Sequence, residues 1–117
     1  MHSEDKEDYV ILSPVLKEVK EADQILELFF AELKEKISTF SSSNLILDFS
    51  QVVNTDVTKI LLFSPISGKQ KDLNKSFVIV SEGINADEIP EELVVVPTLQ
   101  EAIDIIDIEN IERDLGI

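Results

Sequence analysis

The chain has 117 residues, of which 44% are apolar, and this size and composition suit one globular domain with a single core. It has no cysteine, so disulfides, thiolate catalysis and Cys-ligated metal centres are excluded. The net charge of −14 argues against nucleic acid or an anionic membrane as a partner, because both require basic patches.

The sequence predicts neither a membrane span nor an export signal. No stretch approaches the roughly 18 continuous apolar residues that a span requires, and the acidic N-terminus lacks the layout of a signal peptide. We therefore expect a cytoplasmic location. We also expect no cofactor and no metal, since the single histidine, His2, has no second imidazole or thiolate to complete a site. A site made only of carboxylates stays open.

The N-terminal half predicts a flexible leader, a strand and one long helix. Residues 1–8 read as the leader, and residues 9–117 as a single domain. Residues 9–12 are β-prone and are stopped by Pro14, whereas residues 15–19 suit either a second strand or the start of a helix. The helix is indicated by apolar residues at steps of three and four, namely Ala22, Ile25, Leu26, Phe29, Leu33, Ile37 and Phe40.

The C-terminal half alternates apolar runs with helical patterns. Residues 45–49, 77–80 and 93–96 read as buried strands. A helix is expected from residue 58, which Pro65 ends unless it lies in the first turn of a new segment reaching about residue 73. Residues 84–92 predict a loop. Thr98 caps a final helix whose apolar stripe includes Ile106 and extends to Ile111 and Leu115. This order predicts an α/β fold with a mixed sheet of four to five strands flanked by helices.

The most informative segment joins the strand at residues 45–49 to the helix that follows. Asp48 ends the strand and is expected to accept loop amides, while Asp56 is suited to cap the helix. Thr58 then lies exposed in the first turn. A phosphate on it would be stabilised by the helix terminus and by Lys59, and would change how a partner docks.

This segment resembles the STAS-domain antagonists of anti-sigma factors, whose strand ends apolar-Asp-apolar-Ser and whose helix opens Asp-Ser-Ser-Gly-Leu. The matching residues here are 47–50 and 56–60, and the strand and helix around residues 98–103 are also similar. The resemblance covers roughly residues 9–106. It departs at Val57 and Lys59, which replace the first serine and the glycine, and Thr58 is the one aligned hydroxyl.

The resemblance implies a non-catalytic regulatory module of bacterial type that docks on a kinase-like anti-sigma factor or a related switch protein. The residues that it implies for the contact are Asp48, Asn54, Thr55, Asp56, Val57, Thr58 and Lys59, with Thr58 as the candidate phosphosite. An alternative is a STAS-like assembly module without a working switch, for which a homodimer is considered. A second alternative is a response-regulator receiver, but residues 11–14 lack its acidic pair. Sequence motifs of hydrolases are absent.

Overall fold

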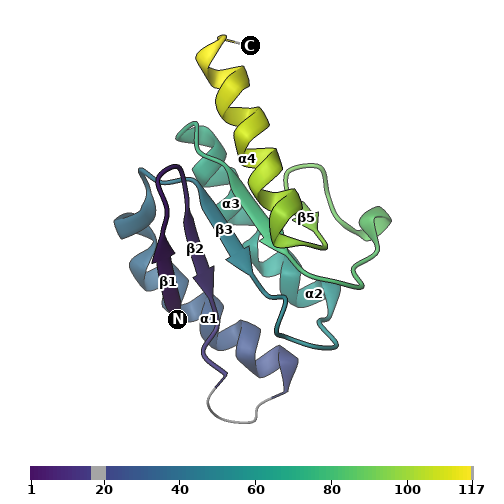
Figure 1. Ribbon diagram of the computed structural model, residues 1–117. Coiled ribbons are helices and arrows are strands. Elements are labelled where there is room, and N and C mark those ends of the chain that lie inside the picture. The colour runs from purple at the N-terminus through teal and green to yellow at the C-terminus, as the bar shows by residue number, and fades with distance from the viewer. Residues whose placement is uncertain (17–20, 117) are drawn as a thin grey trace.

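The computed structural model describes residues 1–16 and 21–116 and has a five-stranded mixed sheet with helices on both faces (Figure 1). This confirms the predicted α/β class and strand number. The strands lie side by side in chain order, and they are β1 (His2–Asp5), β2 (Val10–Ser13), β3 (Leu45–Asp48), β4 (Phe77–Val80) and β5 (Val94–Val96). β1 is antiparallel to β2, whereas β2 to β5 are mutually parallel.

The helical segments also follow the predicted order. They are α1 (Ala22–Lys36), η1 (Ile37–Phe40), α2 (Val57–Ile60), η2 (Leu61–Phe63), α3 (Ser64–Asp72), η3 (Ala86–Glu88) and α4 (Leu99–Asp114). Pro65 lies in the first turn of α3, where its missing amide breaks no helical hydrogen bond. The helical run after residue 56 therefore continues past the proline as a new segment.

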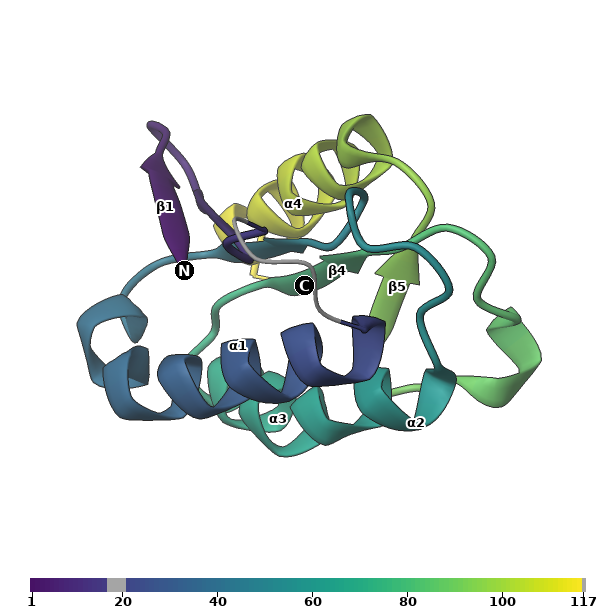
Figure 2. The ribbon, with the colours of Figure 1, turned by 90° about the horizontal axis from the view of Figure 1, so that it is seen from below.

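Side chains of the sheet alternate between two apolar layers. Leu45 and Leu47 of β3 face the layer formed with α1, η2 and α3, while Ile46 faces α4. Figure 2 shows the same arrangement from below, with α1, α2 and α3 on one side of the sheet and α4 alone on the other. Because both faces are covered, β3 and β4 are almost wholly apolar runs, as buried parallel strands require.

The first layer is centred on a cluster of phenylalanine rings. Phe29 of α1 meets Phe49, just after β3, edge-on with ring centres 5.1 Å apart. Phe63 of η2 packs 5.5 Å from Phe49. Phe29, Phe49 and Phe63 are all buried, and this confirms Phe29 as a core residue. The cluster holds α1 and η2 against the end of β3, which is where the predicted contact loop begins.

The segment predicted to be a leader outside the domain instead supplies β1. Its four residues pair with β2 in register from His2 opposite Ser13 to Asp5 opposite Val10. All four side chains are exposed, so no apolar alternation in the sequence marks this strand. Backbone pairing places β1 in the sheet, and the ammonium of Met1 donates to Glu32 of α1 at 3.0 Å. Neither kind of contact leaves a pattern in the sequence.

The connection between β4 and β5 is a loop with one short turn, η3, as predicted. Residues 15 and 16 belong to no helix or strand, and the rest of the ambiguous segment, residues 17–19, lies outside the described residues. Within the described part of the chain, no helix is both long and apolar enough to cross a bilayer.

α4 begins as predicted but packs differently near its end. The hydroxyl of Thr98 accepts a hydrogen bond of 3.2 Å from the amide of Glu101, so the expected cap forms. Ala102 and Ile106 are fully buried against the sheet. The predicted extension of this stripe is wrong, because Ile111 is 58% and Leu115 is 68% exposed. Here the inward positions are taken by Asn110 and Arg113 instead.

Candidate functional site

The predicted contact residues lie on the loop from β3 to α2, at the carboxyl ends of the parallel strands (Figure 1). The start of this loop is fixed to the sheet. The amide of Phe49 donates to the carbonyl of Val80 at 2.9 Å, and the amide of Val52 donates to the carbonyl of Phe49 at 2.9 Å. The side chains of Phe49 and Val52 are buried, whereas Ser50, Gln51 and Val53 are exposed.

Asp48 serves the loop in the way that the sequence predicts. It is half-buried at the end of β3, and its Oδ1 accepts a hydrogen bond of 3.0 Å from the amide of Ser50. This bond satisfies a loop amide next to the sheet and turns the chain away from the strand direction. Asp48 is thus a turn-forming residue in this structure.

Asp56 caps α2, also as predicted. Its Oδ1 accepts a hydrogen bond of 2.9 Å from the amide of Thr58. The backbone amide of Thr58, its hydroxyl and the nearby charge of Lys59 hold the pKa of Asp56 below its ordinary value. Thr58 is exposed, and Val57 beside it is half-buried. The hydroxyl of Thr58 therefore lies in solvent next to an ionised carboxylate.

The middle of the loop is shaped by its backbone. Asn54 has a left-handed conformation with φ of 57°, which asparagine tolerates better than most residues. Thr55 is half-buried, and its hydroxyl donates to the carbonyl of Val52 at 3.3 Å. This turn leaves the side chain of Val53 at 74% exposure, the highest value among the exposed large apolar side chains that the structure describes.

Lys59, which the sequence analysis expects to stabilise a phosphate on Thr58, is paired with another residue. Its Nζ forms an ion pair with Glu27 of α1, whose side chain is 54% exposed. This hydrogen bond and the charges of Glu27, Asp23 and Asp56 raise the pKa of Lys59. The structure therefore brings α1 into the site, through a residue that the sequence analysis did not connect with it.

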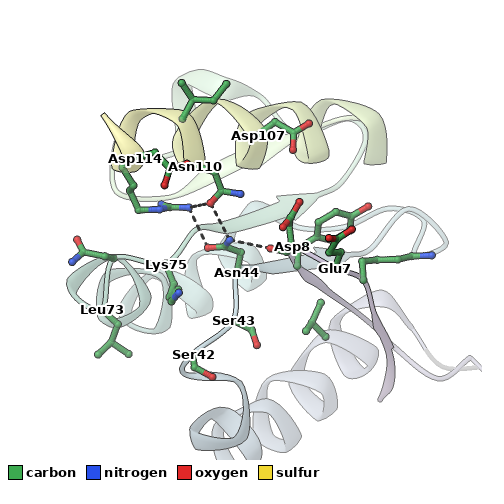
Figure 3. A pocket seen from close by; sticks show the side chains of 16 residues that line it. Glu7, Asp8, Ser42, Ser43, Asn44, Leu73, Lys75, Asp107, Asn110 and Asp114 are labelled. Atoms are coloured by element: carbon green, nitrogen blue, oxygen red, sulfur yellow. Dashed lines mark hydrogen bonds between the residues drawn. The ribbon is translucent and has the colours of Figure 1, made fainter. Parts of the chain in front are cut away.

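A second polar cluster lies at the opposite end of the sheet, around the amino ends of β3 and β4 (Figure 3). Its centre is Asn44, which is only 9% exposed. The Asn44 amide nitrogen donates to the carbonyl of Asp8 at 3.0 Å and to Asn110 at 3.3 Å. Its oxygen accepts from the amide of Ser76 at 2.8 Å. Asn44 thereby connects β4, the turn before β2, and α4.

Arg113 completes this cluster from the last turn of α4. Its guanidinium donates to the side chains of Asn44 at 3.3 Å, Ser76 at 3.1 Å and Asn110 at 2.6 Å. Ser76 in turn donates to Glu109 of α4. The one sequence signal for this cluster is that Arg113 is the single base after residue 75.

The cluster forms the floor of an open polar hollow of about 980 Å³ between the turn before β2 and the end of α4. A smaller hollow of about 410 Å³ lies beside β5, under the loop that contains η3. It is lined mainly by aliphatic side chains, including Ile84, Ile89 and Leu93, and by Ser81, whose buried hydroxyl has no partner. Neither hollow includes a residue of the predicted contact loop.

Among the described residues, no group of three or more histidine, aspartate or glutamate side chains is arranged to hold a metal ion. No family model matches the chain, and no curated protein matches its sequence.

Proposed function

We propose that the chain is a STAS-like regulatory module of the bacterial cytoplasm that binds another protein through residues 53–59, here called the docking loop. The observation that carries the proposal is an apolar side chain held out in solvent by a fixed turn. Val53 is 74% exposed, while Asn54 and the cap at Asp56 fix the backbone around it. A rigid loop with an exposed apolar tip loses little conformational entropy on binding, which favours docking.

The STAS-like assignment is supported by the order of elements and by the roles of two residues. The segment that resembles the family's motif runs from the strand end at Asp48 to the helix start at Asp56, and each carboxylate accepts a backbone amide there. The partner that the resemblance implies is a kinase-type anti-sigma factor or a related switch protein. Catalysis forms no part of the proposal.

The charges around Thr58 argue against its phosphorylation. The hydroxyl is exposed, so a kinase has access to it. A phosphate would lie next to Asp56, whose lowered pKa keeps the carboxylate charged, and like charges at this distance repel. Lys59 is engaged with Glu27 and would have to leave that ion pair to neutralise the phosphate. We therefore favour docking that does not depend on phosphate.

The receiver alternative is less well supported by the sheet. Receiver-type domains belong to doubly wound folds in which the second strand lies outside the first, and this reversal creates their site. Here the parallel strands follow chain order from β2 to β5 without a reversal. The sheet thus lacks the crevice at which a receiver's aspartate acts.

The test is affinity capture from the source cytosol with the full chain and its Val53→Ser and Thr58→Glu variants, followed by mass analysis of the captured chain. Both variants should lose the same bound protein, and the wild-type chain should carry no added phosphate. Leu73→Ser is the matched control, because Leu73 is 51% exposed but precedes β4 at the other end of the sheet. It should keep the partner.

Circular dichroism should show that all three variants are folded as the wild type is. Retention of every partner by both loop variants would refute docking through the loop. An added phosphate on Thr58, with partner binding lost only in Thr58→Glu, would restore the switch and reject our phosphate-independent reading.

A further inference from the structure

The C-terminal half of α4 carries a second apolar stripe that faces away from the sheet. We call Ile108, Ile111 and Leu115 the outer stripe, and these side chains are 56%, 58% and 68% exposed. At roughly 100° per residue, they lie within about 60° of one another around the helix axis and roughly opposite Ile106, which is fully buried. Apolar residues at spacings of i, i+3 and i+7 on one exposed side of a helix are the usual layout of a helix-binding face.

This half of α4 is presented to solvent and held in place. Figure 1 shows that α4 runs past the amino ends of the parallel strands, so its last turns project from the body of the domain. The projecting end is anchored from below, because Asn110 and Arg113 are hydrogen-bonded to Asn44 (Figure 3). The outer stripe is therefore pre-organised for binding rather than a frayed end.

Acidic side chains border the outer stripe on both sides. Asp107 and Asp114 lie along one flank, Glu101 and Glu112 along the other, and Asp104 continues the stripe toward the start of the helix, all of them exposed. The one base in α4, Arg113, points inward to the polar cluster. The outer face of α4 is thus apolar at its centre and negative at its edges.

The acidic residues beside the outer stripe indicate which kind of partner it can bind. A second copy of the chain would bring another acidic rim against this one, in a chain whose net charge is −14. Anionic lipid surfaces are repelled for the same reason. A partner helix whose apolar residues are flanked by lysine or arginine complements both the apolar outer stripe and the acidic side chains beside it.

We infer that the outer face of α4 is a docking site for a basic amphipathic helix of a partner protein. This site is separate from the docking loop, because Arg113 contacts the residue before β3 whereas the docking loop follows β3. The two surfaces lie at opposite ends of the sheet, so one chain can hold two partners at once. The inference does not depend on the function proposed for the docking loop.

The probe is a synthetic helical peptide of about five turns, roughly 18 residues, with a leucine stripe flanked by lysines. Its binding to the full chain is measured by fluorescence anisotropy. One matched peptide carries glutamate in place of lysine, and another keeps the composition but disperses the leucines around the helix. We expect the first peptide to bind with a Kd that rises with salt, the second not to bind, and the third to bind at least about tenfold more weakly.

The matched protein variants localise the binding. The triple variant Ile108→Ser, Ile111→Ser, Leu115→Ser keeps every charge and should weaken the lysine peptide at least about tenfold. Leu28→Ser changes an equally exposed leucine of α1, at 62%, and should leave the Kd unchanged. Asp107→Asn with Glu112→Gln should weaken binding a few-fold and reduce its dependence on salt.

An equal Kd for the triple variant and the wild type would overturn the inference, since binding would then follow net charge alone. No binding of the lysine peptide to the wild type would overturn it as well. Sedimentation that shows a dimer of the wild type, lost in the triple variant, would assign the outer stripe to self-association instead.

Discussion

Asp56 links the chemistry of one carboxylate to the shape of the docking loop. It holds the amide of Thr58 at the start of α2, and this requires an oxygen acceptor at that position. Hydrogen bonds from Thr58 lower its pKa, so the folded chain favours the ionised form. The stability that Asp56 contributes therefore depends on pH.

The sign of this dependence follows from the direction of the shift. Above the ordinary value of 3.8, the carboxylate is ionised in both folded and unfolded chains, and its contribution is fully present. As the pH falls below 3.8 toward the lower folded pKa, the contribution is lost. Asp56→Ala should thus be less stable than wild type in urea denaturation at pH 7, and this difference should shrink near pH 3. The neighbouring Gln51→Ala should show no such change, and a difference that grows on acidification would contradict the argument.

Single residues also show what the sequence can and cannot predict about the site. The roles of Asp48 and Asp56 were predicted correctly, because each acts on an amide two residues away. The ion pair of Lys59 with Glu27 was not predicted, since it joins two elements 32 residues apart. Local capping leaves a pattern in the sequence, whereas contacts between elements depend on how the helices pack.

At the scale of elements, the polar cluster under α4 is another set of contacts that depends on how the helices pack. Arg113 and Asn44 are 69 residues apart and meet only because α4 crosses back over the sheet. The helix itself was predicted from Thr98 and its inner stripe. The sequence analysis placed Ile111 and Leu115 on the buried face of the helix, but both are exposed. They are apolar like the residues of the inner stripe, yet their spacing from Ile106 turns them away from the sheet.

The cluster should govern how firmly the end of α4 is held. Asn44→Ala leaves the amide of Ser76 and the guanidinium of Arg113 without their shared acceptor, and a buried group left in this way costs about 2 kcal/mol. We expect that loss of unfolding free energy in urea denaturation, together with faster amide exchange in the last turns of α4. The exposed Gln24→Ala serves as control and should change neither. Unchanged exchange in Asn44→Ala would show that apolar packing alone fixes the helix.

At the scale of the whole molecule, charge works against compactness. The chain carries 24 acidic and 10 basic residues, and folding brings the excess negative charges closer together. Exposed ion pairs, such as that of Lys36 with Glu32, offset little of this repulsion.

Salt should therefore stabilise the fold. Added sodium chloride screens the repulsion over a Debye length that falls from about 30 Å at 0.01 M to about 10 Å at 0.1 M. We expect the Tm to rise over this range in a thermal melt followed by circular dichroism. Potassium chloride at equal ionic strength should give the same rise. A Tm that falls with salt would mean that attractive ion pairs outweigh the net repulsion.

The exposed strand β1 has a consequence for aggregation. Its paired partner β2 has the apolar sequence Val10-Ile11-Leu12, which is nearly fully buried. If β2 were the border of the sheet, it would offer unpaired amides on an apolar strand, which is the template on which fibrils grow. β1 occupies that border with Glu4 and Asp5 exposed, and on the other border β5 is three residues long and is followed by Pro97. The acidic strand β1 thus covers the edge of β2 and disfavours the addition of strands from other chains.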